Sequence, residues 1–246
     1  MKVINKQIQG IFIVLFLLHN AFAKAQNTPE KKEKMTAAII RYEVKNEYQA
    51  EFQKAISNYV HQSLLNENNM MSEAYFEQDN QTVIWLFERW NNQKDLDKFR
   101  NNSNAVTTLL KKALVKPEEI IHVKDLEPIS KQEWRKRSRA EDKQLTIMLF
   151  VDAKPGTEEN FKKIYHKAMP EFRSEAGVVT YQLSEFENDK TKFVTFEKFR
   201  SNDAFQFHLN FPPIQPVIDY LNTSIKKPPF HDGIHNLIEF APLTRE

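Results

Sequence analysis

A repeat with an offset of 109 residues is the feature that most limits how this 246-residue chain can fold. The strand-like runs QTVIWLFERW and KTKFVTFEKF both end in a glutamate, a basic residue and an aromatic residue, and a polar helix start follows each. The offset is the distance from Glu88 to Glu197, and it also pairs Phe52 with Phe161. A repeat of this kind predicts two copies of one supersecondary unit.

Both copies show the same order of elements, which is strand, helix, strand, strand, helix, strand. This is the split βαββαβ order of a ferredoxin-like unit. Pro212 and Pro213 are predicted to interrupt the second helix of the second copy, because proline lacks an amide donor and clashes with the preceding turn. The predicted strands cover residues 37–44, 72–77, 82–90 and 119–125 in the first copy and 145–153, 177–187, 190–199 and 236–241 in the second.

The fold class predicted from this order is α+β, with two tandem ferredoxin-like βαββαβ modules at 36–126 and 145–242. Such a unit carries its helices on one face of an antiparallel sheet, so two copies can press their bare faces together as a closed pseudo-dimer. In QTVIWLFERW both the odd-numbered and the even-numbered positions include apolar residues. Because alternate residues of a strand face opposite sides of a sheet, this indicates a strand buried on both faces and supports the pseudo-dimer. Residues 127–144 are predicted to be a linker, and we interpret the basic stretch 131–143 as solvated.

The first 25 residues have the pattern of a cleaved secretory signal peptide. Lys2 and Lys6 precede a short apolar run at 11–18, and alanines at 21, 23 and 25 offer cleavage sites. The apolar run is far shorter than the roughly 20 residues that span a bilayer. We therefore expect a periplasmic or secreted protein with no membrane association after cleavage, in which residues 26–35 form a disordered segment before the first strand.

Charge and cysteine content narrow the function classes. The formal charge of +2 would become −1 after loss of Lys2, Lys6 and Lys24 with the signal segment, which contains no acid. A near-neutral domain is a poor nucleic-acid binder, since such binding depends on neutralising phosphates. The chain has no cysteine, which excludes thiol catalysis and cysteine-ligated metals. Stability must therefore come from apolar cores.

The third strand of each copy ends in Glu-Arg-Trp or Glu-Lys-Phe, and a polar break and an aromatic-rich helix follow, with His208 in the second copy. This pattern resembles the antibiotic biosynthesis monooxygenase (ABM) family. The resemblance covers about 36–126 and 145–242 and implies the dimeric α/β-barrel fold. It also implies oxidation of small phenolic or quinol-type aromatics by molecular oxygen, without a cofactor, in the cleft between sheet and helices. His208 corresponds to a histidine that the family often places early in the second helix. Phe99 stands there in the first copy, so activity is expected in the second.

Two residues are candidate catalytic groups. A neutral imidazole such as that of His208 can take a phenolic proton. Glu197 could orient a histidine, although its match with Glu88 in the first copy favours a contact that stabilises the fold. Aromatic side chains could bind the substrate or pack in the core. These candidate substrate-binding residues are Tyr75, Trp90, Tyr165, Tyr181, Phe199 and Phe205.

Alternative functions, a metal site and the oligomeric state can also be weighed from particular residues. A non-catalytic module that binds a small aromatic ligand, as a sensor, carrier or scavenger, fits the same pattern. Haem-degrading relatives place an asparagine on the first strand, which neither copy has, although Trp90 could supply their tryptophan. No metal site is predicted, because Pro and Gly near His231 and His235 indicate a loop. Two fused copies complete one barrel, so we expect a monomer, with a homodimer as the alternative.

Overall fold

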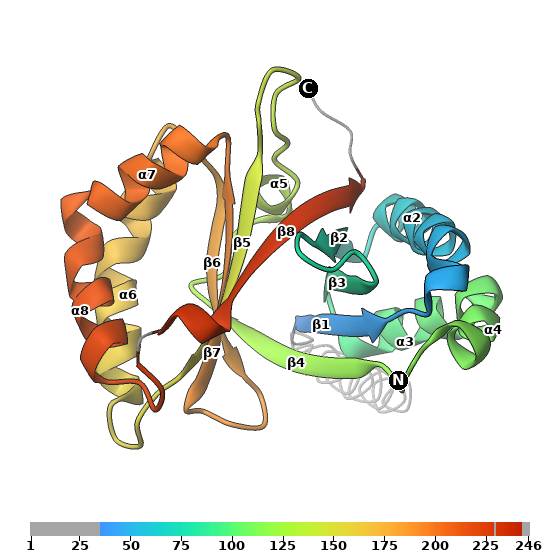
Figure 1. Cartoon of the computed structure of the whole chain (residues 1–246), viewed down its shortest axis with the longest axis horizontal. Coiled ribbons are helices and arrows are strands. Elements are labelled where there is room, and N and C mark those ends of the chain that lie inside the picture. Colours follow the sequence, from blue (N-terminus) through green and yellow to red (C-terminus); the bar gives the residue numbers. More distant parts are fainter. Residues whose placement is uncertain (1–34, 229, 243–246) are drawn as a thin grey trace, which may run out of the picture. The chain divides into compact units, whose positions relative to one another are not determined.

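The computed structural model describes residues 35–228 and 230–242 (Figure 1). The predicted signal peptide and nearly all of segment 26–35 lie outside these described residues. Within the described part of the chain, no helix is both long and apolar enough to cross a lipid bilayer.

The βαββαβ order occurs twice, as predicted. The first module contains β1 (Thr36–Glu43), α2 (Gln49–Leu65), β2 (Asn69–Glu77), β3 (Val83–Trp90), α3 (Gln93–Asn101), α4 (Asn104–Ala113) and β4 (Glu119–Leu126). The second contains β5 (Leu145–Asp152), α6 (Glu158–Ser174), β6 (Val178–Phe186), β7 (Lys192–Phe199), α7 (Asn202–Asn210), α8 (Gln215–Thr223) and β8 (Ile234–Ala241). A short helix, α5 (Lys131–Trp134), lies between the modules, and 3-10 turns occur at Asn46–Tyr48, Pro212–Ile214 and Phe230–Gly233.

The strands form one closed barrel in the order β1-β3-β2-β8-β5-β7-β6-β4. The last strand of each module joins it to the other module: β4 pairs with β6 at Val123 and Phe186, and β8 pairs with β2 at Ala74 and Ala241. Figure 1 shows α2, α3 and α4 outside the strands of the first module and α6, α7 and α8 outside those of the second. The predicted pseudo-dimer of two sheets is therefore confirmed.

Alternation along the strands divides the side chains between two environments. In β3, Ile84 and Leu86 pack against the helices, whereas Trp85 and Phe87 point into the barrel. Every residue of β3 is buried, which confirms the expectation of a strand covered on both faces. Full burial of a side chain such as Phe87 contributes roughly 1.5–3 kcal/mol, so these double-faced strands are a main source of stability.

The second helix is interrupted in both modules. The break at Pro212 and Pro213 separates α7 from α8, as predicted. The first copy was expected to have one helix there, but α3 ends at Asn101 and α4 begins at Asn104. The Ser103 hydroxyl donates to the Phe99 carbonyl at 2.9 Å, and such local side-chain bonds compete with helix continuation.

The linker corrects the prediction of a solvated segment. Trp134 on α5 is 1% exposed, and the Arg89 guanidinium lies 3.9 Å from the centroid of its ring. Arg137 binds Glu73 at 3.1 Å. The basic linker is therefore docked on one end of the barrel, because its cations and its tryptophan meet carboxylates and a guanidinium from the strands.

That end of the barrel, here called the ionic end, contains buried charges in matched pairs. Arg89 binds Asp125 at 2.7 and 3.0 Å, and Lys198, which the repeat pairs with Arg89, binds Glu239 at 3.3 Å. Lys198 also binds both carboxylate oxygens of Glu73 at 2.9 Å. Buried charges require such partners, so this network keeps the ionic end filled.

Candidate functional site

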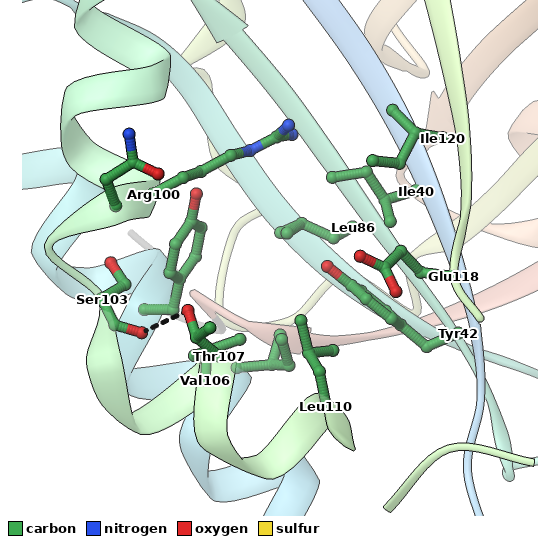
Figure 2. A pocket seen from close by; sticks show the side chains of 13 residues that line it. Ile40, Tyr42, Leu86, Arg100, Ser103, Val106, Thr107, Leu110, Glu118 and Ile120 are labelled. Atoms are coloured by element: carbon green, nitrogen blue, oxygen red, sulfur yellow. Dashed lines mark hydrogen bonds between the residues drawn. The ribbon is translucent and has the colours of Figure 1, made fainter. Parts of the chain in front are cut away.

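A pocket of about 220 Å³ lies between the sheet and the helices of the first module (Figure 2). Figure 2 shows Arg100 at one end, Tyr42 and Glu118 near the strands, and Val106 and Leu110 projecting from α4. Most of the wall is apolar. The lining residues are Ile40, Tyr42, Ile56, Tyr59, Leu86, Arg100, Asn101, Ser103, Val106, Thr107, Leu110, Glu118 and Ile120.

The polar end of this pocket is organised by Glu88, whose side chain is fully buried. Arg100 donates to Glu88 Oε2 from Nη2 at 2.8 Å and from Nε at 3.2 Å. Tyr59 and Trp90 donate to Glu88 Oε1 at 2.8 and 3.3 Å. Burial opposes the charge on Arg100, but the Glu88 carboxylate outweighs it and raises the pKa of the guanidinium. The site is therefore a compensated ion pair.

The hydroxyls of Tyr42 and Tyr59 stay protonated at neutral pH. Burial and the nearby Glu88 carboxylate raise the pKa of both Tyr42 and Tyr59 well above the ordinary value. The Tyr59 hydroxyl already donates its hydrogen bond to Glu88. Tyr42, which lines the pocket, is the group that can offer a hydroxyl to a ligand.

The equivalent region of the second module is built around His208 on α7, which is 1% exposed. Its Nδ1 lies 2.7 Å from Glu175 Oε1. The rings of Phe172, Tyr181 and Phe199 surround the imidazole at centroid distances of 4.7, 5.3 and 5.2 Å. His208 Nε2 and Glu175 Oε2 are buried without a hydrogen-bond partner in the described part of the chain.

Burial disfavours the charged forms of both His208 and Glu175. It lowers the pKa of His208 to about 4. Burial, with a smaller effect of the Glu197 charge, raises the pKa of Glu175 to about 7. At neutral pH the imidazole is therefore uncharged. In the tautomer whose Nδ1–H donates to Glu175, the lone pair is on Nε2.

Glu197 belongs to a second hydrogen-bonded group in the same core. It accepts from Thr195 Oγ1 at 2.7 Å and from the Tyr181 hydroxyl at 3.0 Å. Burial raises the pKa of Glu197 to about 7. Among the described residues Glu197 makes no hydrogen bond with His208, since Glu175 occupies that role.

The structure brings together five of the eight residues singled out from the sequence, and a sixth lies beside them. His208, Glu197, Tyr165, Tyr181 and Phe199 share the core of the second module, and Phe205 packs on Phe199 at 5.3 Å.

The remaining two lie elsewhere. Trp90 is in the first module beside Phe99, at 5.1 Å between ring centroids. Tyr75 lies inside the barrel and donates to Glu73 at 2.5 Å. Tyr75 and Tyr181 are both on the second strand of their modules, but they face opposite sides of the sheet.

Sequence reasoning missed Glu175 and Arg100. Glu175 is 33 positions from His208, and it caps the end of α6 without any motif around it. Arg100 follows Phe99, so the same comparison that found Phe99 opposite His208 also placed Arg100 opposite Leu209. That exchange of a cation for an apolar residue was available in the sequence.

The described residues contain no group of three or more His, Asp or Glu side chains placed to hold a metal ion. His235, which was expected in a loop, lies in β8 and places Nδ1 at 2.5 Å from Glu77. His231 lies in the 3-10 turn before it.

Comparison with known proteins agrees with this architecture. The family model described as antibiotic biosynthesis monooxygenase matches residues 35–108 and 144–218. The "putative monooxygenase" of Lactobacillus acidophilus NCFM is 14% identical, with a TM-score of 0.69, over 84% of this chain and 94% of that one. The Fusobacterium nucleatum subsp. nucleatum "putative monooxygenase" is 15% identical, with a TM-score of 0.71, over 84% and 93%.

An anthrone oxidase-like protein is 10% identical with a TM-score of 0.54, over 86% of this chain and 92% of that one. At such identities these structures establish a shared fold. No curated protein shows significant sequence similarity to the chain. The family match covers both modules and more than half of the residues, so the chain belongs to the antibiotic biosynthesis monooxygenase family.

Proposed function

We propose that this chain is a monooxygenase that oxidises small phenolic or quinol-type aromatics with molecular oxygen, in its second module. The observation that carries the proposal is His208, whose Nδ1 is held by Glu175 at 2.7 Å while Nε2 is buried without a partner. A neutral imidazole with one nitrogen fixed by a carboxylate is the arrangement of a general base. An acidic phenolic hydroxyl is the partner that the free nitrogen lacks.

In the proposed reaction the phenolic proton moves to His208 Nε2, and the electron-rich phenolate reacts with oxygen at a ring carbon bearing hydrogen. One oxygen atom bonds to that carbon and becomes a quinone oxygen. The O–O bond breaks, and the second oxygen leaves as water with the former phenolic and ring hydrogens. The substrate supplies all of the electrons, so the reaction as proposed needs no flavin, haem or metal.

The surrounding rings would hold a flat substrate against the base. Phe172, Tyr181 and Phe199 already contact the imidazole, and Glu197 fixes the Tyr181 hydroxyl. Because His208 is 1% exposed, a substrate can reach Nε2 only if the cover over it moves. The short helix α7, which ends at the Pro212–Pro213 break, is the element best placed to do so.

The decisive experiment measures oxygen uptake by the full chain with a panel of hydroquinones and hydroxynaphthalenes. His208→Ala should lower turnover by about 100-fold or more, because the proton acceptor is lost. Phe99→Ala, at the matching position of the first module, should change turnover by about twofold or less. Equal losses in both variants, or no uptake by the wild type, would reject the proposal.

A second candidate is a module that binds a small aromatic ligand without turnover. The 220 Å³ pocket of the first module favours it, since this pocket has apolar walls, Arg100 at its polar end and the Tyr42 hydroxyl near the strands. Val106→Phe should fill the pocket. Thermal-shift titration with the same panel, followed by recovery of unchanged ligand, would support this candidate if Val106→Phe abolishes the shift and His208→Ala does not.

We also propose that the protein is exported and acts as a monomer, with the small aromatic molecule and oxygen as its partners. Export is supported by the pattern of residues 1–25, and the monomer by a barrel that one chain closes. Cell fractionation with mass analysis of the N-terminus tests the first point. Sedimentation of the purified protein tests the second, and a dimer mass would contradict it.

A further inference from the structure

One end of the barrel carries an open cavity that neither helix-side site includes. It has a volume of about 380 Å³ and opens at the end opposite the ionic end. We call it the barrel mouth, and define it by Arg41, Trp85, Ile121, Phe150, Phe186 and His235. These residues come from β1, β3, β4, β5, β6 and β8, so both modules build it.

Four rings in the barrel mouth lie close enough to form one apolar wall. Trp85 is 5.9 Å from Phe150 and 5.5 Å from His235, and Phe150 is 5.5 Å from His235 and 6.0 Å from Phe186, measured between ring centroids. Phe150 and Phe186 are only partly buried. Clustered aromatic rings that remain accessible to solvent commonly mark a binding site.

The rings are held in place before any ligand arrives. Glu77 accepts from Trp85 Nε1 at 3.1 Å and lies 2.5 Å from His235 Nδ1, so one carboxylate orients two of the four rings. The Arg41 guanidinium lies 5.9 Å from the Trp85 ring centroid and is held by Glu43 at 3.3 Å. A preorganised wall loses little entropy on binding, which favours affinity.

The size and charge of the mouth limit the ligand class. A volume of about 380 Å³ is at the small end of the range for small-molecule sites, and it suits a molecule of one or two fused rings. The rim offers Arg41 and Lys192 as cations and Glu119 and Asp152 as carboxylates, so it favours neither ionic sign. Flat aromatic faces and a planar guanidinium select for a planar π system.

We infer that the barrel mouth is a binding site for a neutral, planar one- or two-ring aromatic molecule. It is separate from the proposed reaction, because Trp85 and Phe150 point into the barrel while Glu197 and His208 lie on the helix side of the sheet. An aromatic compound can therefore bind at the mouth whether or not the helix-side sites turn it over.

The test uses 6-fluoro-2-methoxynaphthalene, a neutral two-ring probe without a phenolic hydroxyl, so that it cannot be deprotonated. Fluorine NMR of the full chain should show saturable binding. Ile121→Phe, which adds bulk inside the mouth, should weaken binding by about tenfold or more. Val106→Phe, which adds bulk in the pocket of the first module, should change affinity by about twofold or less.

A second measurement needs only the wild-type protein, and so it decides the matter even if Ile121→Phe folds poorly. With isoleucine methyl groups labelled, the bound probe should show Overhauser contacts to Ile121. Contacts to Ile40 or Ile56 instead would place the probe in the pocket of the first module and overturn the inference. Absence of saturable binding to the folded protein would overturn it as well.

Discussion

Glu88 and Glu197 occupy matching positions in the two modules, but their environments are opposite. Glu88 is fully buried beside Arg100, which holds it at 2.8 Å. Among the described residues, Glu197 is hydrogen-bonded only by the hydroxyls of Tyr181 and Thr195, because the position that matches Arg100 is Leu209, which is 37% exposed. The same backbone therefore supports a compensated ion pair in one module and a carboxyl with a raised pKa in the other.

The difference teaches that one side chain on the neighbouring helix decides the electrostatics of this site. In the first module the cation lies at the end of an open pocket. In the second, the corresponding space contains the His208 imidazole and its ring of aromatic side chains. Inside the barrel the modules agree, since Arg89 with Asp125 matches Lys198 with Glu239. Divergence between the copies is concentrated on the helix side of the sheet.

Arg100→Met gives the largest expected effect. It leaves Glu88 buried without its cation, which should lower the free energy of unfolding by about 3–5 kcal/mol in urea denaturation. Leu209→Met, the matched change in the second module, should alter stability by about 0.5 kcal/mol or less. Adding Glu88→Gln to Arg100→Met should restore part of the lost free energy of unfolding, because it removes the unpaired charge. A small effect of Arg100→Met, or a double variant as unstable as the single one, would contradict the comparison.

Glu197→Gln is expected to reduce the pH dependence of the free energy of unfolding. The pKa of Glu197 is raised to about 7 in the folded protein, so its contribution to stability is present below the unfolded value of about 4.3 and is lost as pH rises through 7. The wild type should lose about 2 kcal/mol from this group between about pH 5 and 8. Glu197→Gln should remove this part of the loss and leave the part that comes from Glu175, whose pKa is also raised to about 7. Thr195→Val, which leaves the Glu197 carboxyl titratable, should retain both parts.

His208→Gln should remove a smaller loss of stability that occurs as the pH falls, the direction opposite to that of Glu197. The pKa of His208 is lowered to about 4, so its contribution is full above the unfolded value of about 6.5 and is lost as pH falls through 4. The wild type should lose about 1–2 kcal/mol from this group by about pH 5, and His208→Gln should not. NMR titration of the imidazole provides a direct check, and a midpoint near 6.5 would contradict the buried neutral state.

The fold could be predicted from the sequence because its determinants are local and repeated. The matched strand ends, the doubly apolar β3 and the Pro212–Pro213 break each act within a few residues. The site depended on contacts that form only when the barrel closes. Glu175 reaches His208 from another helix, and Trp134 reaches Arg89 from the linker. Neither contact has a sequence spacing that could have revealed it.

One error was avoidable from the sequence. The offset that defines the repeat pairs Tyr181 with Ser72 and Tyr75 with Ser184. Because alternate residues of a strand face opposite sides of the sheet, this register already separates Tyr75 from Tyr181.

The position of β8 has a consequence for how the chain acquires its structure. β2 belongs to the first module, yet one of its edges is covered only when β8 pairs with it, more than half of the chain later. During synthesis that edge stays unpaired, and unpaired strand edges are where misassociation starts. The pairing also gives the chain a high contact order, which predicts slow folding. We expect the two modules to unfold together in one cooperative thermal transition, and not as two independent domains.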